Sequence, residues 1–433
     1  MTTGALAAVN PHYLDRVVET AQSHEVAASE DIFTGNGIKL IAKGARVDAS
    51  MRDRLLEHKL RKPLEDCVEV VGGVTAARLE AAGDALLEKH PLLRALCAPE
   101  RARGAPASLA ALSLSMPLQS LLSVYATPAG RLEHAVGVAM LALSLARKLL
   151  LGDVDRHRLL ATAGLVHDVG ELYLDPVLLQ KGTRLDAEKW RHIVTHPLVG
   201  GRVLQDLAGA GPVVANAVLL HHERLDGFGY PRNVSGEAFT LDGQIVAAAE
   251  WLMALVESDP SPLARARMAD RLVPGEFSPE LLAAVSAAAR QAPDVSIELS
   301  SVSPLVDAVP RIVRLAETLG RFGESRAWID ERIAESNPAL RAILEAGLQR
   351  MLRIQASFSS TGLAAHNAEQ VLRDSAALHD AHVYVEIMTL VGELEWRMRE
   401  LERSQRLRAS LLSPPEHAVI ADLIDRLRRV HVK

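Results

Sequence analysis

The stretch HHERLDGFGYP, residues 221–231, decides the fold. Two adjacent histidines end an apolar helical run, and the chain then passes through an Asp-Gly turn signal into a Gly-Tyr-Pro loop. Further side chains of the metal-ligand type recur along the chain at intervals of about 25–33 residues: His134, the pair His167-Asp168, His196 and Glu250. Such an interval holds one helix and its connection, so successive helices can each deliver one residue to a common site.

Imidazole and carboxylate groups are the ligand types suited to Fe, Mn or Zn. The set exceeds the three or four protein ligands of a single catalytic zinc, which favours two divalent metal ions. Asp168 can bridge two cations through its two oxygens. We expect His134 and Glu250 to flank one metal and His196, His221 and His222 to flank the other. Because the chain has 16 histidines, spacing alone leaves open that they are ordinary surface or core residues.

The composition predicts a mainly α protein of several domains. The chain has 433 residues, of which 48% are hydrophobic and only 3% aromatic, and this favours helices packed through aliphatic side chains. An Asn36-Gly37 turn signal between short β-prone runs indicates a small α+β module over residues 1–72. Helical spacing then predicts a connector over 73–120, a helical bundle over 121–292 and a separate α-helical domain over 293–433.

Charge and cysteine content exclude several classes of protein. The formal net charge of −6 gives no basic excess for a nucleic-acid partner. Cys67 and Cys97 are too few for a disulfide framework and are not arranged as a redox or metal pair.

The longest apolar run, about 136–146, falls short of the ~20 residues of a membrane span. We therefore expect a cytoplasmic protein with no membrane partner.

The segment 381–412 is predicted to form a long helix that mixes charges densely with apolar positions. Two interpretations stay open: a solvated amphipathic helix, or a helix through which two copies of the chain form a homodimer.

The local motifs resemble the HD-GYP family of cyclic di-GMP phosphodiesterases, over residues of about 121–292. The family marks occur in the family's order: His134, then HDVG at 167–170, HPLVG at 196–200 and the GYP stretch at 221–231. The resemblance implies an HD-domain helical bundle with metal ligands at His134, His167, Asp168, His196, His221 and His222. It also implies a substrate groove beside Gly229, Tyr230 and Pro231.

The activity implied by the resemblance is hydrolysis of cyclic di-GMP to pGpG, and in some members to GMP, by a hydroxide that bridges the two metals. A related cyclic dinucleotide is the alternative substrate. Asp168 and Glu171 are then the residues expected at the reacting phosphodiester.

Three positions depart from the family pattern. Glu171 stands where the family has a lysine that faces the substrate phosphate, so a cation has become an anion. Glu250 replaces an aspartate that is one methylene shorter. In place of an Arg-Pro-Tyr-Arg-like stretch, the chain offers Arg265 and Arg267, of which Arg265 is the candidate substrate contact. The alternative function is therefore a degenerate HD-GYP module that acts as a signalling or scaffold protein with a protein partner.

Overall fold

The computed structural model describes residues 8–97, 103–180, 186–207, 209–258, 261–272, 275–293, 304–364, 366–377 and 381–428. It is mainly α-helical, which confirms the predicted fold class. The chain divides into two compact units, Met1–Asp259 and Pro260–Lys433, and each is described by itself. Among the described residues, no helix is both long and apolar enough to cross a membrane. The finer division at residues 72, 120 and 292 stays a prediction.

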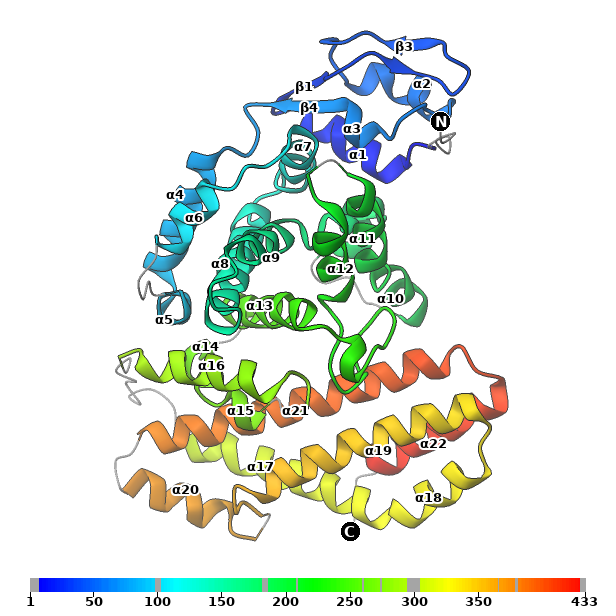
Figure 1. The fold of residues 1–433 in the computed structure, drawn as a ribbon. Coiled ribbons are helices and arrows are strands. Elements are labelled where there is room, and N and C mark those ends of the chain that lie inside the picture. The colour runs from blue at the N-terminus through cyan, green and yellow to red at the C-terminus, as the bar shows by residue number, and fades with distance from the viewer. Residues whose placement is uncertain are drawn as a thin grey trace. The chain divides into compact units, whose positions relative to one another are not determined.

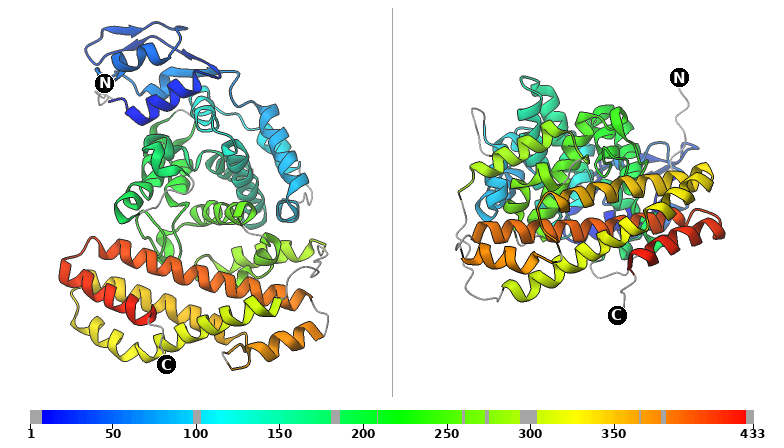
Figure 2. Two further views of the ribbon diagram at one scale, coloured as in Figure 1. Left: turned by 180° about the vertical axis from the view of Figure 1, so that it is seen from behind. Right: turned by 90° about the horizontal axis from the view of Figure 1, so that it is seen from below.

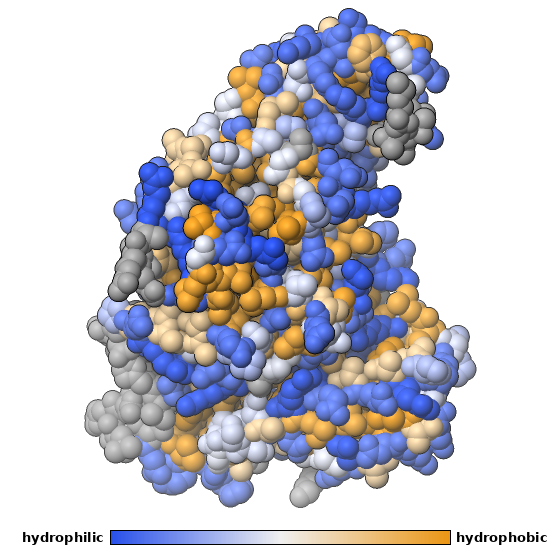
Figure 3. Space-filling view, viewed as in Figure 1, coloured by the Kyte–Doolittle hydropathy of each residue, from blue (hydrophilic) through white to orange (hydrophobic). Residues whose placement is uncertain are grey.

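The first unit begins with the expected small α+β module (Figure 1). Its elements are α1 Pro11–Thr20, β1 Glu25–Ala28, β2 Ile32–Phe33, β3 Lys39–Ile41, η1 Ala49–Met51, α2 Arg52–Leu56, α3 Leu64–Cys67 and β4 Val68–Val71. β1 pairs antiparallel with β4, and β2 with β3. Gly37 has a φ of 82° at the predicted turn between β2 and β3, a conformation that glycine adopts without strain. On the face drawn in Figure 3, the surface of this module is mostly hydrophilic.

A helical bundle completes the first unit. Its elements are α4 Ala76–Lys89, α5 Pro91–Leu96, α6 Ala105–Ala110, α7 Met116–Tyr125, α8 Arg131–Leu149, α9 Val154–Val166, η2 Val169–Tyr173, η3 Pro176–Leu179, α10 Ala187–Ile193, α11 His196–Asp206, α12 Gly211–Leu220, η4 Gly236–Ala238 and α13 Leu241–Ser258. The central helix α8 is buried from Ala135 to Ala146 and packs against α9 and α13. α12 packs against α9 and α13, and α11 packs against α12, so the helices that carry predicted ligands form one connected bundle.

Glycines bring two pairs of backbones close together in this bundle. A Cβ at Gly164 of α9 would lie 2.7 Å from the Cα atom of Ala139 in α8. A Cβ at Gly170 of η2 would lie 2.0 Å from the carbonyl oxygen of His196 at the start of α11. Real Cβ atoms do not approach other atoms so closely, so only glycine fits at either position.

The second unit is all-helical in its described residues. Its helices are α14 Pro262–Arg267, α15 Ala269–Leu272, α16 Pro279–Gln291, α17 Pro304–Glu324, α18 Arg326–Glu335, α19 Pro338–Ser359, α20 Ala368–Ala377, α21 Ala381–Ala409 and α22 Pro414–Arg428. The long helix α21 contacts α14, α17, α19, α20 and α22, and its apolar residues Leu390, Val391, Leu394 and Leu401 are buried there (Figures 1 and 2). A homodimer through this helix would have to use its exposed residues and stays a prediction.

A buried ionic network ties the start of this unit to its long helices. Glu276, which precedes α16, bonds Arg350 of α19 at 2.9 Å and also Arg397 of α21. Arg397 pairs with Glu393 at 2.9 Å, and Glu393 in turn pairs with Arg265 of α14 at 2.6 Å. Such charges are held inside a protein only when they are paired. Residues 261–293 therefore belong structurally with the C-terminal helices.

Replacing Arg397 by alanine should destabilise the second unit strongly, because each of two buried carboxylates, Glu276 and Glu393, then loses one of its two arginine partners. We expect the free energy of unfolding of this unit to fall by about 3–5 kcal/mol, measured by urea denaturation. The control is Arg373→Ala, which breaks an exposed α20 pair with Glu369 and should cost at most about 1 kcal/mol. If both variants lost the same free energy of unfolding, the buried network would stabilise the unit no more than an exposed ion pair does.

Candidate metal centre

Five helical segments deliver the predicted ligands to one place in the first unit. His134 lies one turn into α8, and His167 and Asp168 follow the end of α9. His196 is the first residue of α11, His221 and His222 follow the end of α12, and Glu250 lies in the middle of α13. The structure brings all seven residues together, as the spacing predicted.

The seven side chains form two adjacent groups. One group holds His134, His167 and Glu250, and the other holds Asp168, His196, His221 and His222. Within each group, one ligand atom from every residue lies within 4.8 Å of the others. His167 thus joins His134 and Glu250, a position that the spacing did not decide.

Asp168 faces both groups at once. Its Oδ2 atom lies 3.3 Å from Nε2 of His167 and 3.7 Å from Nε2 of His134. Its Oδ1 atom lies 3.3 Å from Nε2 of His196 and 3.5 Å from Nε2 of His221. Oδ1 is buried and has no hydrogen-bond partner among the described residues. The carboxylate thus presents one oxygen to each of the two groups of side chains.

The orientation of the imidazoles also fits cations. Nδ1 of His167, His196 and His221 lies 2.6–2.8 Å from the carbonyl oxygen three residues earlier in the chain. In the neutral ring Nδ1 therefore carries the hydrogen, and Nε2 presents a lone pair. Yet Nε2 of His196 lies 3.1 Å from Nε2 of His221. Two lone pairs at this distance repel each other, and a metal ion that both nitrogens coordinate removes the repulsion.

His134 is oriented by a side chain that sequence reasoning missed. Its Nδ1 atom lies 2.9 Å from Oε1 of Glu257, two turns after Glu250 on α13. Its Nε2 atom lies 3.2 Å from Oε2 of Glu250. A carboxylate on the far nitrogen fixes the ring and makes the near nitrogen a better ligand. Acidic residues seven apart on one helix face were the available signal.

The electrostatics differ between the two groups. Burial lowers the pKa of His221 to about 4 and that of His222 well below its usual value, so both rings are neutral ligands near pH 7. Burial would also lower the pKa of His134, but the Glu250 carboxylate raises it to about 11. For Glu250 itself, burial acts to raise the pKa, and His134 lowers it well below the usual range. This side of the centre therefore attracts positive charge.

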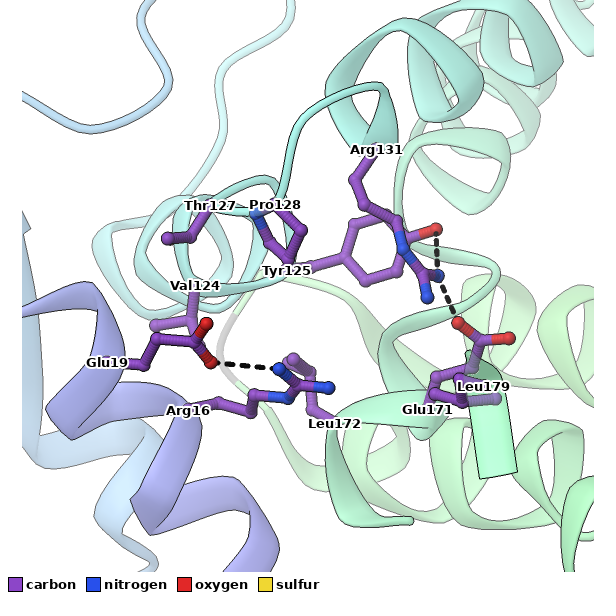
Figure 4. A pocket seen from close by; sticks show the side chains of 10 residues that line it. All are labelled: Arg16, Glu19, Val124, Tyr125, Thr127, Pro128, Arg131, Glu171, Leu172 and Leu179. Atoms are coloured by element: carbon purple, nitrogen blue, oxygen red, sulfur yellow. Dashed lines mark hydrogen bonds and ion pairs between the residues drawn. The ribbon is translucent and has the colours of Figure 1, made fainter. Parts of the chain in front are cut away.

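The structure pairs Glu171 with a cation. Its carboxylate forms an ion pair with Arg131, the first residue of α8, and the same guanidinium donates to the Tyr125 hydroxyl at 3.2 Å (Figure 4). That hydroxyl donates to Oδ2 of Asp168 at 3.3 Å. Arg131 therefore offsets the charge reversal that the sequence predicted beside the phosphate. Sequence reasoning missed Arg131 and Tyr125, because no motif marks them.

The Gly-Tyr-Pro loop borders the second group. The Tyr230 ring stacks on the ring of His222, with centroids 4.6 Å apart. The loop is held by Glu223, a fully buried carboxylate that accepts the backbone N–H groups of Arg232 and Val234. A Cβ at Gly229 would lie 2.2 Å from the Cα atom of Glu223, which explains the glycine. Gly229, Tyr230 and Pro231 are thus placed beside the ligands.

Arg265, the predicted substrate contact, lies in the second unit. Its guanidinium pairs with the buried carboxylate of Glu393 at 2.6 Å. The structure therefore gives it a structural partner, and its contact with substrate stays a prediction.

The HD domain family matches residues 114–270, which include all seven ligands. A 3'3'-cGAMP-specific phosphodiesterase 1 of Vibrio cholerae is 37% identical over 128 residues, covering 30% of this chain and 29% of that protein. Residues 114–270 therefore form an HD domain, and its motifs resemble those of the HD-GYP family. A 3'3'-cGAMP-specific phosphodiesterase 3 of the same organism is 32% identical over 171 residues, covering 38% and 37% of the two chains.

A cyclic di-GMP phosphodiesterase of Pseudomonas aeruginosa is 33% identical over 127 residues, covering 29% of this chain and 30% of that protein. The chain thus spans about a third of the length of these curated relatives.

Removing one ligand should release metal from the HD-GYP domain. We expect His167→Ala to weaken metal binding by about tenfold or more, because a direct ligand matters at least as much as the groups that orient one. Metal content after gel filtration, measured by mass spectrometry, checks this. His192→Ala, on α10, is the matched control and should keep the metal content of the unchanged protein. Equal metal in both variants would refute the ligand assignment.

Glu171→Lys should destabilise the HD-GYP domain more than Glu171→Gln does. The glutamine removes one partner of the ion pair, whereas the lysine also places a second cation against Arg131. We expect a loss of about 2 kcal/mol or more for the lysine variant, measured as the free energy of unfolding. Glu188→Lys, at an exposed position of α10, should be near neutral. A lysine variant as stable as the unchanged protein would mean that Arg131 does not depend on Glu171.

Proposed function

We propose that the HD-GYP domain is a metal-dependent phosphodiesterase that hydrolyses a cyclic dinucleotide, cyclic di-GMP or 3'3'-cGAMP. The observation that carries the proposal is the position of Asp168, with one oxygen toward His134 and His167 and the other toward His196 and His221. Two divalent ions of Fe, Mn or Zn fit these two groups. The names of the similar phosphodiesterases support the substrate class.

A pair of divalent ions, when bound, supplies charge neutralisation for the phosphoryl oxygens and lowers the pKa of a water molecule that attacks phosphorus. The side chains of the protein hold and orient these ions. His134, His167 and Glu250 form one side of the centre, and His196, His221 and His222 form the other. Asp168 fixes the distance between the sides, and the Tyr125 hydroxyl donates to its Oδ2 atom. No covalent intermediate on a side chain is required.

Arg131, which is linked to Asp168 through Tyr125, and the Gly-Tyr-Pro loop, whose Tyr230 stacks on His222, are the substrate-facing candidates. The guanidinium of Arg131 stays charged, because Tyr125 and Glu171 raise its pKa against the effect of burial. It neutralises Glu171 next to the centre, so the approach of an anionic phosphodiester is not opposed by an unpaired carboxylate. Tyr230 offers an aromatic face against which a guanine base can stack.

The proposal is tested by turnover with matched controls. The full chain, loaded anaerobically with Mn or Fe, is incubated with cyclic di-GMP and separately with 3'3'-cGAMP, and linear products are separated by chromatography. We expect product from the unchanged protein and a fall in kcat of about 100-fold or more in Asp168→Asn, because loss of a bridging carboxylate disturbs both groups. Asp175→Asn, at the exposed N-cap of η3, should keep the activity.

The second candidate is a degenerate HD-GYP module that serves as a signalling or scaffold protein with a protein partner. Glu171 at the usual lysine position favours it. Metal-loaded protein that binds cyclic di-GMP without forming any product would support this candidate and contradict the proposed hydrolysis. We also propose that the protein is cytoplasmic and that it forms a homodimer.

A further inference from the structure

The second unit contains an elongated cavity of about 600 Å³ among four helices. α17 and α21 form its long walls, and α19 and α22 complete it. Lining residues on α17 extend from Arg311 to Arg321, about 15 Å along the helix axis, and those on α21 extend over the same length from Glu395 to Gln405. The volume lies within the range of small-molecule sites, and the shape suits an extended ligand better than a round one.

The middle of the cavity is apolar. Its walls include Leu315 of α17, Met351 of α19, Met398 and Leu401 of α21 and Ile424 of α22. Leu315, Met351, Leu401 and Ile424 are themselves largely buried against the bundle, so they form a fixed wall. Unbranched methionine side chains adapt their shape to an aliphatic occupant. The interior therefore favours a hydrocarbon chain over a polar ligand.

The rim of the cavity carries an excess of positive charge. Five arginines and three glutamates line it, a formal excess of two positive charges. Arg311 is neutralised by Glu395 at 2.7 Å, and Arg428 by Glu402. Arg321 donates to the carbonyl oxygen of Leu427 at 2.9 Å.

Arg314 and Arg399 differ from the other rim arginines. Among the described residues, neither guanidinium forms an ion pair or a side-chain hydrogen bond, and both are exposed. Arg314 lies one helical turn after Arg311 on α17, and Arg399 one turn after Glu395 on α21. Arg311 pairs with Glu395 at one end of the cavity, and near the other end Arg321 bonds the carbonyl of Leu427, next to the Arg428 that pairs with Glu402, so α17 and α21 run in the same direction. Arg314 and Arg399 therefore both lie about one helical turn from the Arg311–Glu395 pair.

We propose that this cavity binds an organic carboxylate with an extended aliphatic chain. The carboxylate lies between Arg314 and Arg399, and the chain extends along the apolar wall toward Leu401 and Ile424. Guanidinium groups bind carboxylates through paired, charge-assisted hydrogen bonds, which fixes the end at which the head group sits. The site is separate from the metal centre and does not depend on the proposed phosphodiesterase activity.

The test uses isothermal titration calorimetry on the full chain with three probes that share a linear ten-carbon chain: decanoate, decanol and decyltrimethylammonium. We expect decanoate to bind with one-to-one stoichiometry, about tenfold or more tighter than decanol, because only the anion forms hydrogen bonds to charged groups. The cationic probe should bind weakest. No saturable binding of decanoate, or equal affinity for all three probes, would overturn the proposal.

Two variants locate the binding. Arg314→Ala combined with Arg399→Ala should weaken decanoate by about tenfold or more and leave decanol unchanged. Arg373→Ala, on the exposed face of α20, is the matched control and should bind decanoate as the unchanged protein does. Both substitutions of the pair are at exposed positions, so circular dichroism should show the same thermal transition in all three proteins. Unchanged decanoate affinity in the double variant rejects the site.

Discussion

The structure depends on one constraint: the two oxygens of Asp168 face two groups of imidazoles, in one of which Nε2 of His196 and Nε2 of His221 lie only 3.1 Å apart. In His167, His196 and His221 a backbone carbonyl occupies Nδ1, so Nε2 has no hydrogen to give. Such an arrangement is unfavourable without positive charge at its middle. Five helical segments and the large aliphatic core around α8 nevertheless hold these side chains together. The fold thus keeps the candidate metal ligands in position.

The order of ligand-bearing helices was readable from the sequence because most of the candidate ligands, Glu250 excepted, sit at a helix end or on a recognisable motif. The regular interval between His134, the His167-Asp168 pair and His196 indicated one residue per helix, and the structure agrees. The sequence did not show which of the two groups His167 joins. That depends on the direction in which its side chain points at the end of α9. Contacts of this kind depend on helix crossing, which spacing does not encode.

Other features were hidden because they join residues far apart in the chain. Arg131 and Glu171 are separated by 40 residues, and only the fold brings them together as a pair. The same is true of Glu276 and Arg397, 121 residues apart, whose buried pairing groups the segment after residue 260 with the C-terminal helices. In both cases a charged side chain is balanced by a partner that lies far away in the sequence, as burial requires.

Gly170 has a further consequence for how this protein can vary. The backbone of η2 rests directly on the carbonyl of His196, with no side chain between them. The spacing of Asp168 and His196 is thus set by main-chain contact, whatever residue follows at position 171. Evolution can exchange a cation for an anion at that neighbouring position, and recruit Arg131 to match, while the ligand framework itself keeps its dimensions.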